Sequence, residues 1–198
     1  PSDCFEVAIE AVRIAVQFMT PVVVLSDGYI ANGSEPWKVP DVKTLPVIKT
    51  GRAKPEDLES YKVFKRNPDT LARLWPAPGL PGFEHRIGGL EKDSLTGHIS
   101  YDPDNHELMV RTRAKKVAGI ANFIPEQEVF GEASGEVLVV GWGSTYGAIR
   151  SAVESLRAEG RKVSHAHLRY LNPFPSNFEE VLNRFSKVLV PEMNLGQL

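Results

Sequence analysis

The sequence has very little cysteine, no long apolar run and no excess of charge of either sign. Its single cysteine, Cys4, cannot form an internal disulfide and cannot alone supply the thiolates of a zinc or iron–sulfur site. The longest apolar runs, residues 22–25 and 137–140, are far shorter than the roughly 18 residues of a membrane helix. With 23 basic and 25 acidic residues, the chain has no basic field for nucleic acid. These absences predict a soluble, cytoplasmic protein that binds neither nucleic acid nor membrane.

The two ends of the sequence indicate a piece of a longer polypeptide. The first residue is Pro1 rather than Met, and no signal peptide precedes it. Residues 191–198 stop where a predicted strand has just ended and a helix could begin. We therefore expect further chain on both sides.

The chain opens with a predicted helix and a predicted strand. Asp3 and Glu6 have the spacing of a capping box, and small apolar residues then recur with helical period until Pro21. Residues 22–25 (VVVL) contain no polar residue, which predicts a strand buried on both faces, as in a parallel sheet. Ligands gather where such strands end, so Tyr29 and Asn32 in the following loop are candidate cleft residues. The alternative is a loop that only reverses the chain.

The next segment, residues 32–104, is rich in proline. More than half of the 15 prolines lie between Pro36 and Pro81, among short apolar pieces. A structureless loop of this length is improbable in a compact domain, so we expect an extended arm with small strands that crosses between domains or subunits. A flexible linker is the alternative. Five aromatic residues argue against a flexible linker, because disordered segments contain few aromatic residues. They are Trp37, Tyr61, Phe64, Trp75 and Phe83.

From residue 104 the pattern becomes regular. Asp104 and Glu107 predict a helix start, and the helix should end before Pro125. Its predicted apolar stripe is Val110, Ala114, Val117, Ala118 and Ala121, opposite a basic stripe of Arg111, Arg113, Lys115 and Lys116. Strands at 137–140, 163–168 and 188–190 alternate with helices at 146–158 and 176–185. This β-α-β-α-β order predicts an α/β fold with a parallel, Rossmann-like sheet.

A glycine-rich turn joins the first of these strands to its helix. A turn of this kind presents free N–H groups that suit a phosphate or carboxylate, and its candidate contacts are Gly141, Gly143, Ser144 and Thr145. The turn departs from the dinucleotide fingerprint, because Tyr146 stands at the third glycine position and no acidic residue ends the next strand. These departures favour the other interpretation, a tight turn whose Ser144 or Thr145 caps the helix.

Several polar residues elsewhere have the chemistry of metal ligands or of residues that line a cleft. His165 and His167 share one face of a strand but have no obvious third ligand, so we predict packing or hydrogen-bonded histidines and no metal site. A calcium loop starting at Asp102 fails, because Glu107 replaces the required glycine and Arg113 replaces the bidentate glutamate. Two nearby side chains, His98 and Tyr101, stay candidates for lining a cleft.

Four segments together resemble a known family. Residues 21–32 (PVVVLSDGYIAN), 88–98 (GGLEKD with GH), 140–147 (VGWGSTYG) and 167–175 (HLRYLNPFP) resemble the alpha subunit of 2-oxoacid:ferredoxin oxidoreductases. Within that family the chain looks most like the C-terminal portion of the 2-oxoglutarate enzyme. The resemblance extends over essentially the whole chain, in order.

The resemblance implies a thiamine-diphosphate enzyme that oxidatively decarboxylates a 2-oxoacid, forms an acyl-CoA and passes the electrons to ferredoxin. In the family a beta subunit holds the diphosphate, Mg²⁺ and an iron–sulfur cluster, so the implied assembly is a hetero-oligomer. Residues 1–31 would end the pyrimidine-binding α/β domain. Residues 32–104 would be the connecting arm, and residues 105–198 the domain similar to the transketolase C-terminal domain.

The resemblance assigns no catalytic residue to this chain. The family's Y-P-I-T-P-type and T-G-x-P-T-[KR]-type motifs, which approach the cofactor and substrate, have no match here. We therefore expect the 198 residues alone to be inactive, with a mainly structural role. The contact with CoA is plausible at Ser144, Thr145 and the basic stripe. The alternatives are a non-catalytic assembly module and a free-standing CoA- or nucleotide-binding α/β module, and among substrates pyruvate and branched 2-oxoacids stay open.

Overall fold

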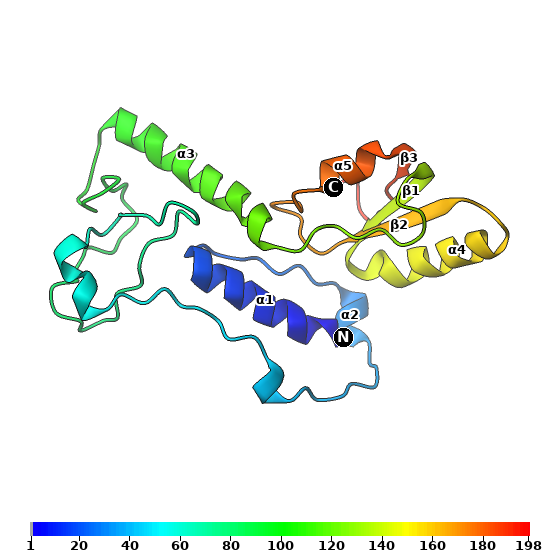
Figure 1. The fold of residues 1–198 in the computed structure, drawn as a ribbon, viewed down its shortest axis with the longest axis horizontal. Coiled ribbons are helices and arrows are strands. Elements are labelled where there is room, and N and C mark those ends of the chain that lie inside the picture. Colours follow the sequence, from blue (N-terminus) through cyan, green and yellow to red (C-terminus); the bar gives the residue numbers. More distant parts are fainter. Residues whose placement is uncertain (1) are drawn as a thin grey trace. The chain divides into compact units, whose positions relative to one another are not determined.

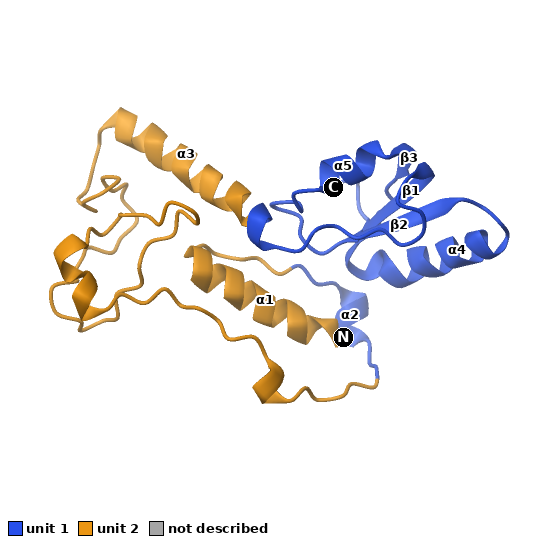
Figure 2. Cartoon of the chain, viewed as in Figure 1, with its two compact units in different colours: residues 1, 25–35, 121–198 blue, residues 2–24, 36–120 orange. Residues whose placement is uncertain are grey.

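A computed structural model describes residues 2–198, which divide into two compact units (Figure 2). Unit 1 contains residues 25–35 and 121–198, and unit 2 contains residues 2–24 and 36–120. Each unit is therefore built from two separate stretches of the sequence.

Unit 1 is built on a parallel sheet of strands β1 (Gly135–Trp142), β2 (Val163–Leu168) and β3 (Phe185–Leu189). Both neighbours of β1 run parallel to it, in the order β2-β1-β3. The predicted α/β fold with a parallel sheet is confirmed. The physical reason is that β1 is mostly apolar, so it can be buried beneath helices on both faces of the sheet, as strands of parallel sheets are.

Two helices cover the sheet, α4 (Tyr146–Ala158) and α5 (Phe178–Asn183), on its two faces (Figure 1). Alternate residues of β1 point to opposite faces. Leu138 and Val140 pack in the cluster that contains Val181 of α5, and Val139 packs with Ile149 of α4. The core of unit 1 therefore consists of two layers, separated by the sheet.

The predicted boundaries in unit 1 hold for α4 and β2 but not for α5. The helix predicted over residues 176–185 begins at Phe178 and ends at Asn183. The Asn177 side chain makes no capping bond, because it accepts from the Gln127 N–H at 2.8 Å and donates to the Gln127 carbonyl at 3.1 Å. Phe185 already belongs to β3, so tertiary contacts shorten this helix at both ends.

The run of residues 22–25 is not a strand in the structure, and this prediction is wrong. Val23 is 81% exposed and Leu25 62% exposed, and neither lies in a described strand. An apolar run has the composition of a buried strand, but a strand forms only where a neighbouring strand accepts its hydrogen bonds. A short helix, α2 (Gly28–Asn32), follows this segment.

Unit 2 contains two long helices, α1 (Asp3–Phe18) and α3 (Pro103–Gly119). The short 3₁₀ helix η3 (Ile120–Phe123) follows α3, and its residues after Ile120 belong to unit 1. The intervening arm has two 3₁₀ helices, η1 (Val42–Thr44) and η2 (Pro55–Ser60). In place of the small strands predicted for the arm, the described residues form isolated β-bridges: Arg52 with Trp75, Arg66 with Arg73 and Lys92 with Ile99.

The aromatic residues of the arm pack as their composition predicted. The Trp75 indole N–H donates to the Val16 carbonyl at 2.8 Å, and the rings of Trp37 and Phe5 lie 5.4 Å apart. Both contacts join the arm to α1. Because Phe83 is also buried, at 2% exposure, the arm has a core of its own.

The helices of unit 2 differ from the prediction in how their first turns are capped and in which face of α3 is buried. Asp102, rather than Asp104, caps α3 by accepting from the Asp104 N–H at 2.9 Å. The Asp3 and Glu6 capping box does not form, because α1 begins after Ser2 with no side-chain cap. In α3 the buried side chain is Met109, at 2% exposure, whereas Val110 of the predicted stripe is 44% exposed. No helix within residues 2–198 is long and apolar enough to cross a membrane.

Candidate functional site

The predicted glycine-rich turn lies at the carboxyl end of β1 and forms the 3₁₀ helix η4 (Gly143–Thr145) before α4. Gly143 has φ +61°, a left-handed conformation that favours glycine. The Thr145 hydroxyl donates to the Trp142 carbonyl at 2.7 Å and makes no capping bond to α4. The turn is thus closed by a bond within itself, and the alternative that Thr145 caps the helix is wrong.

Ser144 of this turn is bound to Asp27. The Asp27 carboxylate accepts from the Ser144 side chain and backbone, and from the Ile30 N–H at 3.0 Å. These bonds, that from the Ser144 side chain first, lower the pKa of Asp27 below its usual value of 3.8. Within unit 1, therefore, the loop after residue 25 and the turn after β1 meet at the same place.

Asp27 sets the charge at the turn. A phosphate that approached the N–H of Ser144 would meet the negative charge of Asp27, which already uses that donor. The contact of CoA with Gly141, Gly143, Ser144 and Thr145 therefore stays a prediction, and it would require Asp27 to give up Ser144.

The other predicted cleft residues divide between the units. Tyr29 of α2 is 81% exposed, and the Asn32 side chain donates to the Gly28 carbonyl at 2.7 Å, both in unit 1. His98 and Tyr101 belong to unit 2, where Tyr101 is 84% exposed. Their participation in one cleft stays a prediction.

The two histidines of β2 form an aromatic cluster with Tyr146. The rings of Tyr146 and His167 lie 4.9 Å apart, and those of His165 and His167 lie 5.9 Å apart. His165 is buried at 2% exposure, and burial together with the charge of Arg150 lowers its pKa below 6.5. A neutral, packed His165 is what this environment favours. Residues 2–198 contain no group of three His, Cys, Asp or Glu side chains that could hold a metal ion.

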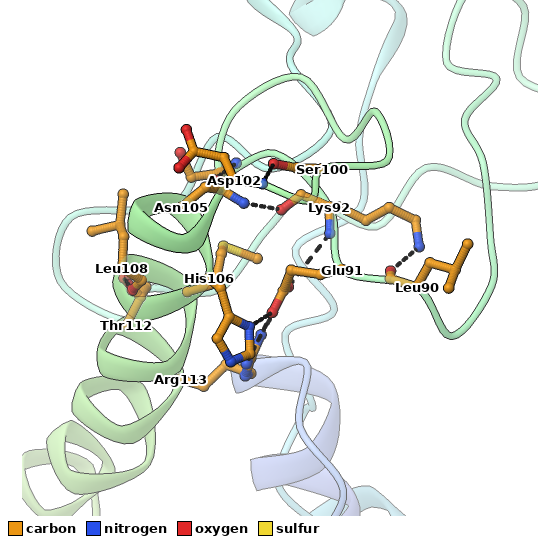
Figure 3. A network of polar contacts seen from close by, with 12 residues as sticks. Leu90, Glu91, Lys92, Ser100, Asp102, Asn105, His106, Leu108, Thr112 and Arg113 are labelled. Carbon is orange, nitrogen blue, oxygen red and sulfur yellow. Dashed lines mark hydrogen bonds and ion pairs between the residues drawn. The ribbon is translucent and has the colours of Figure 1, made fainter.

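Glu91 holds the GGLEKD segment against α3, as Figure 3 shows. Its carboxylate accepts from His106 Nδ1 at 2.9 Å and from the Arg113 guanidinium at 3.3 and 3.4 Å. Burial raises the pKa of Glu91, but these bonds outweigh it and leave the pKa lowered. The Asn105 side chain adds a bond to the Lys92 carbonyl at 2.9 Å. Sequence reasoning missed this network, although the GGLEKD motif marked its position.

The basic stripe of α3 is divided by the helix geometry. Arg111 pairs with Glu107 at 2.6 Å on the exposed surface, and Lys115 is exposed. Arg113 and Lys116 lie one and two turns beyond the buried Met109. All three side chains line one pocket of unit 2. The Lys116 Nζ donates to the Met19 carbonyl at 2.8 Å. Two cations of the predicted stripe, Arg113 and Lys116, thus line a pocket of unit 2.

Lys116 makes the stability of the chain depend on pH. Burial, and then the charges of Arg66, Arg73 and Arg113, lower the pKa of Lys116 from 10.5 to about 8. Below pH 8 the folded chain bears the full cost of this cation. Between pH 8 and 10.5 the folded chain releases the proton while the unfolded chain retains it, so stability rises with pH.

Replacing this cation should therefore stabilise the chain. We expect Lys116→Gln to raise the free energy of unfolding at pH 7 by about 1 kcal/mol, with solvent screening taken into account, because the charge disappears while an amide donor remains. Thermal melts should show the gain shrinking from pH 8 to 10.5. The control, Lys115→Gln, removes an exposed charge and should change little. A variant of Lys116 that melts below the parent chain at pH 7 would contradict the argument.

Two family models match the chain. Residues 1–99 match the thiamine-diphosphate-binding model of pyruvate flavodoxin/ferredoxin oxidoreductase, and residues 135–198 match the pyruvate:ferredoxin oxidoreductase core domain II. The second match contains the whole sheet of unit 1.

Curated and solved relatives agree with these matches. The 2-oxoglutarate oxidoreductase subunit KorA of Mycobacterium tuberculosis is 57% identical over 201 residues, which covers 100% of this chain and 30% of the relative. The 2-oxoacid:ferredoxin oxidoreductase 1 subunit alpha of Aeropyrum pernix is 33% identical and covers 98% of this chain and 31% of the relative.

A solved structure matches over nearly the whole chain. It is a 2-oxoglutarate:ferredoxin oxidoreductase from Magnetococcus marinus with 2-oxoglutarate, coenzyme A and succinyl-CoA bound, and it matches with a TM-score of 0.88 and 33% identity. The match covers 98% of this chain and 33% of that one. The chain thus spans about a third of the length of these relatives. The resemblance stated from the motifs is confirmed, and the chain belongs to the pyruvate flavodoxin/ferredoxin oxidoreductase family.

Proposed function

We propose that this chain is part of the alpha subunit of a 2-oxoglutarate:ferredoxin oxidoreductase. Such an enzyme converts a 2-oxoacid and CoA into an acyl-CoA and CO₂, and passes the electrons to ferredoxin. The observation that carries the proposal is the 57% identity to a 2-oxoglutarate oxidoreductase subunit over the full chain. The structural match to an enzyme with 2-oxoglutarate bound supports the same substrate.

We propose the division of labour that the family resemblance implies. Residues 1–31 would complete the pyrimidine-binding domain, residues 32–104 would be the connecting arm, and residues 105–198 would form the transketolase-like domain. The relatives are named as subunits, which supports an assembly of several chains. A beta subunit would supply the iron–sulfur cluster, with ferredoxin as the electron acceptor, and the assembly would work in the cytoplasm.

The residues of this chain do not by themselves fit the enzyme's cofactors. Thiamine diphosphate supplies the carbanion chemistry in this family. Its Mg²⁺ requires oxygen ligands, and residues 2–198 bring no three acidic, histidine or cysteine side chains together. We therefore assign no reaction step to a residue of this chain. Its proposed contribution is to pack and orient, and the core of unit 1 and the network around Glu91 are suited to that role.

The test uses the complete enzyme, purified from its organism through a tag on the subunit that contains this sequence. With thiamine diphosphate and Mg²⁺, 2-oxoglutarate should support CoA-dependent reduction of methyl viologen. We expect a rate about tenfold or more above that with pyruvate, because a site that pairs a second carboxylate rejects substrates without it. Absence of CoA-dependent reduction with every 2-oxoacid would overturn the proposal.

The chain by itself serves as the control. Under the same conditions the isolated 198 residues should reduce no viologen, because no catalytic motif of the family lies within them. Turnover by the isolated chain would refute its mainly structural role. It would leave the assignment to the oxidoreductase intact.

A further inference from the structure

Unit 2 contains a pocket of about 550 Å³ in which basic side chains far outnumber acidic ones. This volume is in the range of small-molecule sites. Of the described residues that line it, six are basic: Arg66, Arg73, Arg86, Lys92, Arg113 and Lys116. The one acidic residue among them is Glu91.

The basic groups come from three parts of the chain. Arg113 and Lys116 lie on α3, while Arg66 and Arg73 face each other across an isolated β-bridge of the arm. Arg86 and Lys92 lie on either side of the two glycines Gly88 and Gly89. Folding therefore brings together cations that are far apart in the sequence, and the composition of the chain gives no sign of them.

The charge of the pocket is not balanced from within. Glu91 already accepts hydrogen bonds from Arg113 and from His106. Arg66 donates to the Leu71 carbonyl at 3.0 Å and to the Met109 sulfur at 3.8 Å. Arg73 donates to the Val63 carbonyl at 3.2 Å and lies 4.3 Å over the Phe64 ring. These neutral acceptors fix the direction of the guanidinium groups but leave their charges uncompensated.

This arrangement is costly unless an anion is bound. Like charges repel more strongly when they are partly removed from water. Buried charges in proteins are typically paired with an opposite charge. Perturbed groups that cluster in a cleft are typical of functional sites, and the lowered pKa values of Arg66, Arg73 and Lys116 fit that description.

We propose that this pocket binds a ligand with two adjacent phosphate groups. The planar guanidinium groups of Arg66 and Arg73 match phosphate oxygens in pairs, and Lys116 supplies a point charge beside them. A diphosphate carries more charge than a dicarboxylate of similar size, and so offsets more of the six basic groups. Lys92 shapes the site rather than binding the ligand, because its Nζ donates to two carbonyls, that of Gly88 at 2.9 Å and that of Leu90. The Lys116 Nζ donates to one carbonyl, that of Met19, and keeps more of its donors for a ligand. The proposal depends on unit 2 alone and not on the proposed function.

The probe is inorganic pyrophosphate, titrated calorimetrically into the 198-residue chain at pH 7 and low ionic strength. We expect saturable binding at one site, and we expect Lys116→Gln to weaken it about tenfold, the usual effect of removing one charge-assisted hydrogen bond. The matched control is Lys115→Gln, which makes the same change of charge one residue away on α3 and outside the pocket. That control should bind as the parent chain does.

A second variant tests the pocket independently of α3. Arg86 is exposed and lines the pocket, so Arg86→Gln should leave the fold intact and still weaken pyrophosphate binding several-fold. Absence of saturable binding by the parent chain, or equal losses in the Lys115 and Lys116 variants, would overturn the proposal. Tighter binding of 2-oxoglutarate than of pyrophosphate would also overturn it, because the pocket would then select a dicarboxylate.

The source of the diphosphate is decided by competition. If CoA displaces pyrophosphate, and Lys116→Gln weakens both ligands equally, then the diphosphate of a coenzyme is the natural occupant. If CoA leaves pyrophosphate in place, the pocket takes a free diphosphate or another diphosphate ester. Both results support the chemistry of the site and differ only in the carrier.

Discussion

Replacing Leu138 with Ala is expected to lower the free energy of unfolding of unit 1 by about 3–4 kcal/mol. Leu138 lies in the central strand β1 and is fully buried. Its side chain packs in the cluster with Val181 and Phe185, so truncation removes apolar contacts and leaves a cavity that the sheet cannot close. A loss of this size is a large part of the stability of an ordinary domain.

The measurement must distinguish the two units. Hydrogen exchange of the β1 and β2 amides reports on unit 1 alone, and exchange in these strands should become faster in Leu138→Ala. The matched control is Leu189→Ala, because Leu189 of β3 is 57% exposed and loses the same atoms without leaving a cavity. Its effect should stay below about 1 kcal/mol. Equal effects of the two substitutions would contradict the assigned core.

The second large effect is expected at Gly141, where Val should cost about 2–3 kcal/mol. A Cβ at this position would lie 2.5 Å from Cδ1 of Ile149 and 3.1 Å from the Thr145 hydroxyl oxygen. The Ile149 methyl could move to admit a single carbon, so Ala should cost less. The two further methyl groups of Val have no room between β1 and α4, because Ile149 belongs to the packed cluster on that face.

Replacing Gly147 with a larger residue should have the opposite effect and stabilise the chain. This glycine lies in the first turn of α4, and a Cβ there meets nothing within 4 Å. Gly147→Ala should stabilise the chain by about 0.5–1 kcal/mol, because alanine loses less backbone entropy in a helix. Urea unfolding of both variants should show shifts of opposite sign. A stabilising Gly141→Val would show that the turn is not packed as described.

Gly141 and Gly143 show what tertiary contacts add to a local motif. The sequence allowed an anion contact at the N–H groups of this turn but favoured a tight turn whose Ser144 or Thr145 caps the helix. In the structure Gly141 is required by the close approach of Ile149, Gly143 by its positive φ, and Ser144 binds the carboxylate of Asp27. Packing and an internal carboxylate both act on the turn, and no signal in the local sequence pointed to Asp27. The contact of this turn with CoA stays a prediction.

The regular part of the chain was predictable because its signals are local. Helix α4 and strand β2 begin and end where periodicity and Gly160 place them. The run of residues 22–25 has an equally strong local signal, yet it forms no strand. Its hydrogen bonds and buried faces must come from neighbours, which a sequence pattern does not contain.

By itself the sequence determined the parallel α/β unit, the packed state of the proline-rich arm and the family, because periodicity, aromatic content and motifs are properties of short segments. Only the tertiary structure decided which face of α3 turns inward. A shift of one position around the helix exchanged the expected apolar stripe for Met109, Arg113 and Lys116. The basic pocket exists because Arg66 and Arg73 reach those cations through space, and electrostatic contact depends on distance rather than on order along the chain.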